Sequence, residues 1–120
     1  MARILLADDD AAVRDLVRRA LTTDGHTVHV TEDGAEALEY LQAHAATIDI
    51  LVTDVDMPAL DGISLCEQAI ALKPHLGIVL MSGFSDQLDR ANALKAKRLT
   101  SIPKPFTLEQ IKAKVRGMLG

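Results

Sequence analysis

The sequence contains one cysteine, two phenylalanines, one tyrosine and no tryptophan in 120 residues. The single Cys66 excludes an intramolecular disulfide framework and is typical of a reducing compartment. So few aromatic side chains cannot build a platform that stacks nucleic-acid bases. No apolar run approaches the ~20 residues that span a bilayer. No signal peptide precedes the first apolar run, so we expect a cytoplasmic protein. The net charge of −4 gives no general attraction to nucleic acid, and we expect neither nucleic acid nor a membrane as a partner.

The composition is that of an ordinary globular protein. Apolar residues make up 48% of the chain and charged residues 25%, and a chain of this length buries a core without disulfide or metal staples. No internal repeat, linker or low-complexity tract divides it. We therefore expect a single domain over residues 1–120.

Short apolar runs alternate with stretches of helical periodicity along the chain. The runs predict five strands, and apolar residues at i, i+3 and i+4 predict five helices. The predicted strands cover 3–7, 27–31, 48–53, 77–81 and 99–102. The first predicted helix ends at Gly25 and has the inward stripe Val13, Leu16, Val17, Ala20 and Leu21. The next three cover 34–44, the stretch from Ile63 until Pro74 stops it, and 86–96. The last is capped by Thr107 and has the stripe Leu108, Ile111, Val115 and Met118.

Apolar strands that alternate with amphipathic helices predict a parallel sheet covered on both faces and joined by right-handed crossovers. We expect an α/β fold of the flavodoxin-like (βα)5 type, doubly wound, with strand order 2-1-3-4-5. In that order the first and third strands are neighbours at the point where the winding reverses. Such sheets bind ligands at this point, beyond the carboxyl ends of the strands.

Polar residues suited to phosphoryl chemistry stand at the ends of four predicted strands. Asp8 and Asp9 end the first strand, Asp54 the third, Ser82 the fourth and Lys104 the fifth. In the expected strand order the carboxylates of Asp8, Asp9 and Asp54 crowd together, and they repel one another unless protons or a cation reduce the negative charge. Oxygen ligands without histidine or cysteine favour Mg²⁺ as that cation. A hydroxyl and an ammonium beside one carboxylate then form a cradle for a phosphoryl group passing onto Asp54.

These residues resemble the receiver (CheY-like) domains of two-component response regulators. The resemblance covers the whole chain, and its pieces follow one another in order at the expected strand ends. They are Asp8-Asp9, Asp54 with Met57-Pro58 and Asp61-Gly62, Ser82-Gly83, and Lys104-Pro105-Phe106. The resemblance implies a phosphoacceptor domain that switches protein–protein interactions, and not an enzyme that turns over a substrate.

The resemblance also implies which residues hold the metal and the phosphoryl group. Asp54 would accept phosphate from a phosphohistidine of a histidine kinase or histidine phosphotransferase. Asp9, Asp54 and the backbone carbonyl of Asp56 would ligate Mg²⁺, and Asp8 would act largely through water.

Ser82 and Lys104 are implied to respond to the phosphoryl group, Ser82 by turning toward it and Lys104 by pairing with it. The phosphodonor would dock over the mouth of the site and the first helix. A downstream protein would bind the face formed by the fourth helix, fifth strand and fifth helix.

Three interpretations of the whole protein remain open. The Ser82-Gly83-Phe84 turn and the short region before Lys104 resemble the stand-alone CpdR-type receivers of α-proteobacteria, which act as adaptors for ATP-dependent proteolysis. Receivers of hybrid histidine kinases carry a similar turn, so the chain is alternatively a receiver fragment of such a kinase or of a longer DNA-binding regulator. An aspartyl-nucleophile phosphatase of the haloacid-dehalogenase type is a third interpretation. Asp56 imitates its second acid, but the chain has no room for its cap insertion.

Four positions depart from the receiver pattern or modify it. Ser101 stands where receivers often carry an aromatic residue that moves inward, so we expect backbone movement between residues 82 and 102 to carry the response. Pro103 lacks a backbone donor and is expected to end the fifth strand early. Asp56 and Phe84 are expected to flank the mouth of the site.

Other conspicuous residues are interpreted as structural. Asp10 and Asp61 stand just before predicted helices and are expected to cap them. Cys66 lies on the inward stripe of its helix and is expected to fill the core. The four histidines lack metal-ligand spacing and are expected to pack or to lie at the surface.

Overall fold

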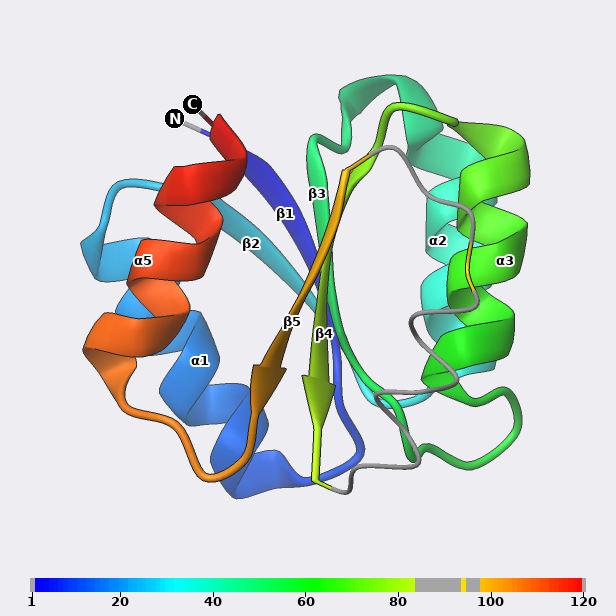
Figure 1. The fold of residues 1–120 in the computed structure, drawn as a ribbon. Helices are drawn as coiled ribbons and strands as arrows, with labels where there is room; N and C mark the ends of the chain where they lie inside the picture. The colour runs from blue at the N-terminus through cyan, green and yellow to red at the C-terminus, as the bar shows by residue number, and fades with distance from the viewer. Residues whose placement is uncertain (1, 84–93, 95–97, 120) are drawn as a thin grey trace.

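A computed structural model of the chain describes residues 2–83, 94 and 98–119, which form a parallel sheet between two layers of helices (Figure 1). The strands are β1 (Arg3–Ala7), β2 (Thr27–Thr31), β3 (Ile50–Asp54), β4 (Gly77–Ser82) and β5 (Leu99–Pro103). The helices are α1 (Ala11–Thr23), α2 (Gly34–His44), α3 (Gly62–Leu72) and α5 (Leu108–Leu119), and a short 3₁₀ turn, η1 (Ala45–Thr47), precedes β3.

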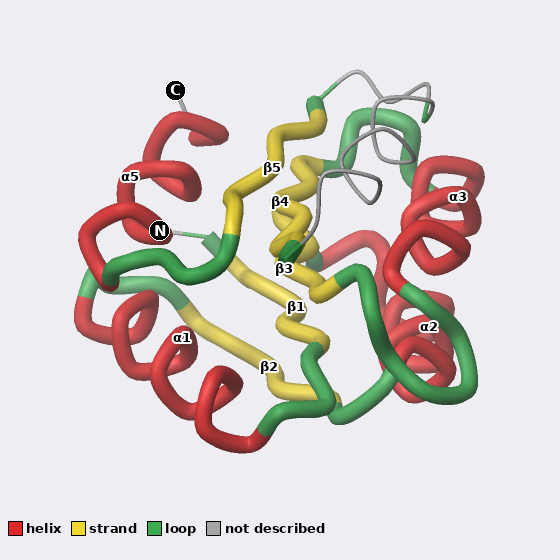
Figure 2. The backbone as a smooth tube through the Cα atoms, turned by 60° about the horizontal axis from the view of Figure 1, so that its bottom comes forward, coloured by secondary structure: helices red, strands yellow, loops and turns green. Residues whose placement is uncertain are grey.

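The strand order is β2-β1-β3-β4-β5, and every neighbouring pair is parallel. Helices α1 and α5 cover one face of the sheet, and α2 and α3 cover the other (Figures 1 and 2). This arrangement confirms the predicted flavodoxin-like order. It also makes β1 and β3 neighbours, so that their carboxyl ends lie side by side.

The core consists of two clusters, one on each face of the sheet. In β1, Ile4 and Leu6 pack toward α1 and α5, whereas Leu5 and Ala7 pack toward α2 and α3. The central strands β1, β3 and β4 are covered on both faces, which explains why their sequences are nearly continuous apolar runs. Cys66 belongs to the second of these faces, and burial raises the pKa of its thiol to about 12.

Helix ends follow the predicted capping residues. The Asp10 side chain accepts hydrogen bonds from the backbone of Ala12 and Val13, and the Asp61 side chain accepts one from Ser64. Thr107 and Gln110 bond each other reciprocally at the start of α5, as in a capping box. Helix α1 is followed by Gly25 at φ 92°, a left-handed conformation that glycine adopts without strain.

The third, fourth and fifth strands differ from the predicted ones at one or both ends, and two of these differences have a clear physical cause. The third strand begins at Ile50 and not at Ile48, because the N–H of Ile48 bonds back to Ala45 and completes the 3₁₀ turn. Pro103 does not end the fifth strand early, since it pairs with Ser82 and the N–H of Lys104 bonds the Ser82 carbonyl at 2.8 Å. Successive strand residues point their N–H groups to opposite sides, so the ring nitrogen of Pro103 faces the open edge, where no ladder bond is lost.

The predicted inward stripes of the first and last helices contain one error each. Leu16 is 44% exposed and Leu108 is exposed as well, whereas their stripe partners Val17 and Ile111 are buried. The predicted helix 86–96 and Phe84 lie outside the described residues, apart from Leu94, which packs against the core. Within the described ranges, no helix combines the length and apolar character that crossing a bilayer requires.

Candidate functional site

Asp8 and Asp9 occupy the loop between β1 and α1, at the carboxyl edge of the sheet. Asp8 is fully buried and Asp9 is exposed. The Asp8 N–H donates to the Thr31 carbonyl at the end of β2, and Oδ1 of Asp8 accepts from the Asp10 N–H at 2.9 Å. Among the residues that the structure describes, Oδ2 of Asp8 has no hydrogen-bond partner. One carboxylate oxygen is therefore anchored and the other is available to a ligand.

Asp54 is the last residue of β3 and is only 7% exposed. The three aspartates Asp8, Asp9 and Asp54 each offer a carboxylate oxygen, and these oxygens lie within 4.8 Å of one another. The crowding expected from the strand order is thus observed. Because β1 and β3 pair in parallel register, the sheet itself brings these side chains together.

Lys104 follows β5 and reaches across β4 to this cluster. Its Nζ lies 3.1 Å from Oδ1 of Asp54 and 3.7 Å from Oδ2 of Asp8. Ser82 lies between them at the end of β4, almost completely buried. Its Oγ has no hydrogen-bond partner in the described part of the chain. A buried hydroxyl without a partner is costly unless a ligand completes it.

Burial raises the pKa of both Asp8 and Asp54 above the ordinary carboxyl value. At Asp54 the Lys104 ammonium opposes this rise, and at Asp8 the hydrogen bond from Asp10 and the charge of Lys104 do so. The neighbouring carboxylates add to the rise by repulsion. The site therefore holds more negative charge than its single lysine offsets, which favours a divalent cation.

The donor set fits Mg²⁺. All three clustered side chains offer hard oxygen atoms, the ligands that this ion prefers in proteins. The unbonded Oδ2 of Asp8 is buried and lies on the side of Lys104 and Asp54. Asp56, whose backbone carbonyl was predicted as a further ligand, lies in the loop two residues beyond Asp54 with an exposed side chain.

Two features of the site were not predicted from the sequence. The first is Arg14, whose Nη1 donates to the backbone carbonyl of Asp8 at 2.9 Å. Arg14 stands in the sequence four residues after the cap Asp10, one turn into the helix, and this spacing is the only signal that would have pointed to it.

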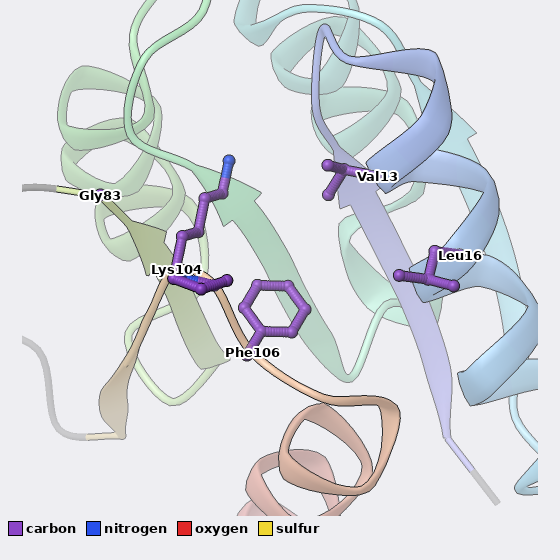
Figure 3. Close-up of a pocket in the computed structure, with 6 residues that line it drawn as sticks. Val13, Leu16, Gly83, Lys104 and Phe106 are labelled. Carbon is purple, nitrogen blue, oxygen red and sulfur yellow. The ribbon is translucent and has the colours of Figure 1, made fainter.

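The second feature is an apolar cavity of about 480 Å³ beside Lys104. It is lined by Val13, Leu16, Gly83, Lys104, Pro105 and Phe106. Figure 3 shows the Phe106 ring between Lys104 and the two α1 residues Val13 and Leu16. Leu16 faces this cavity and not the core, which explains its exposure and the error in the predicted stripe.

Comparison with known proteins gives the following matches. The family model described as the response regulator receiver domain matches residues 4–116. Response regulator MprA of Mycobacterium ulcerans (strain Agy99) is 40% identical over 117 residues, which cover 98% of this chain and 50% of MprA. The chain thus spans about half the length of the curated relatives it matches.

Solved structures give the same match over whole chains. A response regulator receiver protein from Sinorhizobium medicae WSM419 superimposes with a TM-score of 0.87 at 32% identity, covering 98% of this chain and 94% of the other. The receiver domain of the hybrid histidine kinase CckA superimposes with a TM-score of 0.84 at 31% identity, covering 98% of this chain and 99% of the other.

Proposed function

This chain belongs to the response regulator receiver domains, and we propose that it is a phosphoacceptor switch in which Asp54 takes a phosphoryl group from a phosphohistidine. Members of this family generally act as signalling switches in two-component systems. The observation that carries the proposal is the surroundings of the Asp54 carboxylate. It stands at a strand end with two acidic neighbours, a lysine ammonium at 3.1 Å and an unbonded serine hydroxyl nearby.

The transfer forms one bond and breaks one bond. A carboxylate oxygen of Asp54 bonds to phosphorus as the phosphorus–nitrogen bond of the phosphoimidazole breaks. The electron pair of that bond stays on the imidazole nitrogen, which takes a proton from solvent. Lys104 and Ser82 provide a positive charge and a hydroxyl donor for the phosphoryl oxygens, which carry the charge in such a transfer.

Receiver domains bind Mg²⁺ at an acidic pocket, and the aspartates of this chain suit that ion. Asp9, Asp54 and the backbone carbonyl of Asp56 are the proposed ligands, and Asp8 acts through water. When bound, the ion neutralises carboxylate charge and phosphoryl charge at once. The protein's own contribution is to hold these oxygens at the ends of two paired strands, so that little reorganisation accompanies binding.

The phosphodonor, a histidine kinase or histidine phosphotransferase, docks over the mouth of the site and α1. The apolar cavity between α1 and Phe106 supports this, because it opens beside Lys104 and leaves Leu16 exposed. A contiguous apolar surface bordered by polar groups is typical of a protein-binding site.

A downstream protein is the proposed reader of the phosphorylated state. Its binding face would include β5 and α5, together with the predicted helix 86–96, which lies outside the described residues. A groove of about 410 Å³ runs between β5 and the first turns of α5. Phosphorylation adds roughly −1.5 to −2 charges at Asp54 and biases an existing conformational equilibrium.

A second candidate keeps the same chemistry but makes this chain the receiver module of a longer protein. The match over half the length of the curated relatives supports it, as does the likeness to the receiver domain of a hybrid histidine kinase. Output would then pass to another domain of the same polypeptide, and not to a separate partner such as a component of regulated proteolysis.

The proposal is tested by labelling the protein with a small-molecule phosphodonor in the presence of Mg²⁺. We expect one acid-stable, base-labile phosphate per chain, lost in Asp54→Asn and on chelation of the metal. Asp49→Asn is the matched control, because Asp49 is exposed at the opposite end of the sheet, where its side chain accepts a hydrogen bond from the Arg3 N–H. Undiminished labelling of Asp54→Asn would reject Asp54 as the acceptor, and repeated release of phosphate from phosphate esters would favour a phosphatase instead.

A further inference from the structure

Arg14 turns its side chain back from α1 onto the loop that carries the acidic cluster. Its Nη1 donates to the Asp8 carbonyl at 2.9 Å, and its Nη2 lies 3.8 Å from Oε1 of Glu32 in the loop after β2. The Arg14 side chain is only 16% exposed, whereas the Glu32 side chain is well exposed. The contact with Asp8 is therefore the shorter and better shielded of the two.

Asp8 is held at three of its four polar atoms. Its N–H bonds the Thr31 carbonyl at 3.3 Å, and its Oδ1 accepts from the Asp10 N–H at 2.9 Å. Arg14 supplies the third bond, at the Asp8 carbonyl. The fourth atom, Oδ2, makes no hydrogen bond to the described residues and lies 3.7 Å from Nζ of Lys104. The direction in which Oδ2 points is thus set by the other three contacts.

We propose that Arg14 is a positioning residue that fixes the loop between β1 and α1, so that Asp8 and Asp9 present their carboxylates to a divalent cation. The proposal rests on the function proposed above, because it assumes that Mg²⁺ binds this cluster. Arg14 does not contact the cation itself. It acts through the Asp8 carbonyl, which is the only backbone acceptor that its guanidinium meets among the described residues.

Charge and geometry make opposite predictions for the loss of Arg14. A positive charge near a cation site repels the cation, so its removal alone would strengthen binding of Mg²⁺. Loss of a group that orients a ligand weakens binding instead, typically by 10-fold or more. The sign of the change therefore separates the positioning role from a simple contribution to the local charge.

An arginine suits this position better than a lysine. Its planar guanidinium presents donors in two directions at once; here Nη1 donates to the Asp8 carbonyl, and Nη2 forms a longer ion pair with Glu32. The ammonium of a lysine is a point charge on a flexible stem and fixes neither direction. Arg14→Lys keeps the charge and most of the volume and should still loosen the loop.

The test measures the Mg²⁺ dissociation constant by calorimetry for the wild type and for Arg14→Met, Arg14→Lys and Arg18→Met. Arg18 is the matched control, because it lies on the same helix, carries the same charge and pairs with Asp15 alone in the described structure. We expect a dissociation constant about tenfold higher for Arg14→Met, a smaller rise for Arg14→Lys, and an unchanged or slightly lower value for Arg18→Met.

The NMR resonances of backbone amides report the loosening of the loop between β1 and α1 in protein without the metal. In cation-free protein, the Asp9 and Asp10 amides should shift in Arg14→Met and stay in place in Arg18→Met. A merely structural role would lower the melting temperature without changing Mg²⁺ affinity at temperatures where both variants are folded.

Three outcomes are decisive. Mg²⁺ binding by Arg14→Met that equals or exceeds that of the wild type would overturn the positioning role, while the proposed function would stand. A wild type that binds no Mg²⁺ would instead contradict the proposed function. If Arg14→Met does not fold, Arg14→Lys replaces it, and an affinity equal to that of the wild type would then refute the inference.

Discussion

Gly62 lies directly against the backbone carbonyl of Asp54. A Cβ built on Gly62 would come within 2.0 Å of that oxygen, closer than any real Cβ contact. The N–H of Gly62 also bonds the Val55 carbonyl at 2.8 Å. The loop after β3 therefore returns onto its own strand, and α3 begins against the residue that carries the central carboxylate.

Gly62→Ala should destabilise the protein by about 2–3 kcal/mol, because the backbone of β3 must shift to admit the methyl group. Gly117→Ala is the control, since no neighbouring atom of the described residues lies within 4 Å of a Cβ at that position in α5. It should stabilise the protein by about 0.5–1 kcal/mol through helix propensity. Urea denaturation of both variants measures the difference, and a Gly62→Ala protein as stable as the wild type would contradict the close approach.

Removal of Lys104 should separate metal binding from signalling. In Lys104→Met the buried carboxylates lose their neighbouring ammonium, so the cation-free protein should lose about 1–2 kcal/mol of stability. Mg²⁺ affinity should be unchanged or higher, because no positive charge competes with the ion. Phosphorylation should no longer cause in the variant the conformational response, followed by spectroscopy, that it causes in the wild type.

Lys112→Met is the control for Lys104→Met, because Lys112 is a partly buried lysine that pairs with Glu109 within α5. It should behave as the wild type in all three measurements. A phosphorylated Lys104→Met protein with the full conformational response would show that the role assigned to Lys104 is wrong.

The stability of the cation-free protein should fall as the pH rises from acid toward neutrality. Burial raises the pKa of Asp8 and Asp54 in the folded state, so the folded protein binds more protons than the unfolded chain once the pH exceeds the unfolded carboxyl value. Stability is then lost as the pH rises through the folded pKa values. Thermal unfolding in the presence of a chelator between pH 4 and pH 8 measures this loss.

Mg²⁺ should reverse that loss, because the ion binds the ionised carboxylates. At a free concentration of about 100 times the dissociation constant, the expected stabilisation is about 2.7 kcal/mol. The rise in melting temperature should be larger at pH 7 than at pH 5 and should disappear in Asp54→Asn. An equal effect of Mg²⁺ at both pH values would argue that the ion binds elsewhere.

Leu16 should matter for a protein phosphodonor and not for a small one. Leu16→Ser removes an exposed apolar side chain at the mouth of the cavity and should slow transfer from a histidine phosphotransferase about tenfold, the loss of one interface contact of more than 1 kcal/mol. Labelling by a small-molecule donor should be unchanged.

Leu72→Ser is the matched control for Leu16→Ser. Leu72 is exposed to the same degree, 45% against 44%, but lies at the end of α3 on the opposite face of the sheet. Equal slowing by the two leucine variants, or equal slowing with both kinds of donor, would remove the cavity from the docking surface.

The sequence was sufficient for the sheet because the central strands β1, β3 and β4 are largely apolar and four strand ends carry a polar residue suited to phosphoryl chemistry. The same pattern predicts that Asp8, Asp9 and Asp54 share one edge of the sheet, and they do. The capping residues could also be predicted from the sequence, since the Asp10 and Asp61 side chains accept hydrogen bonds from backbone N–H groups within three residues of themselves.

Features that depend on contacts between distant segments could not be predicted from the sequence. Leu16 and Leu108 fit the helical period, yet both are exposed, because periodicity shows which face is apolar and not how far a neighbouring element covers it. In the sequence, nothing distinguishes Arg14 from a surface arginine, because its contact with the Asp8 carbonyl depends on the orientation of the folded helix. Pro103 breaks a strand only when its nitrogen faces a neighbour, and β5 is an edge strand.

Asp54 as the phosphoryl acceptor is tested most directly by a crystal structure of the protein with Mg²⁺ and beryllium fluoride, which mimics a phosphoryl group on a carboxylate. The expected result is fluoroberyllate bonded to a carboxylate oxygen of Asp54, with Mg²⁺ beside Asp9 and the Lys104 ammonium on a fluorine. Fluoroberyllate on another carboxylate, or Mg²⁺ bound away from Asp9 and Asp54, would contradict it.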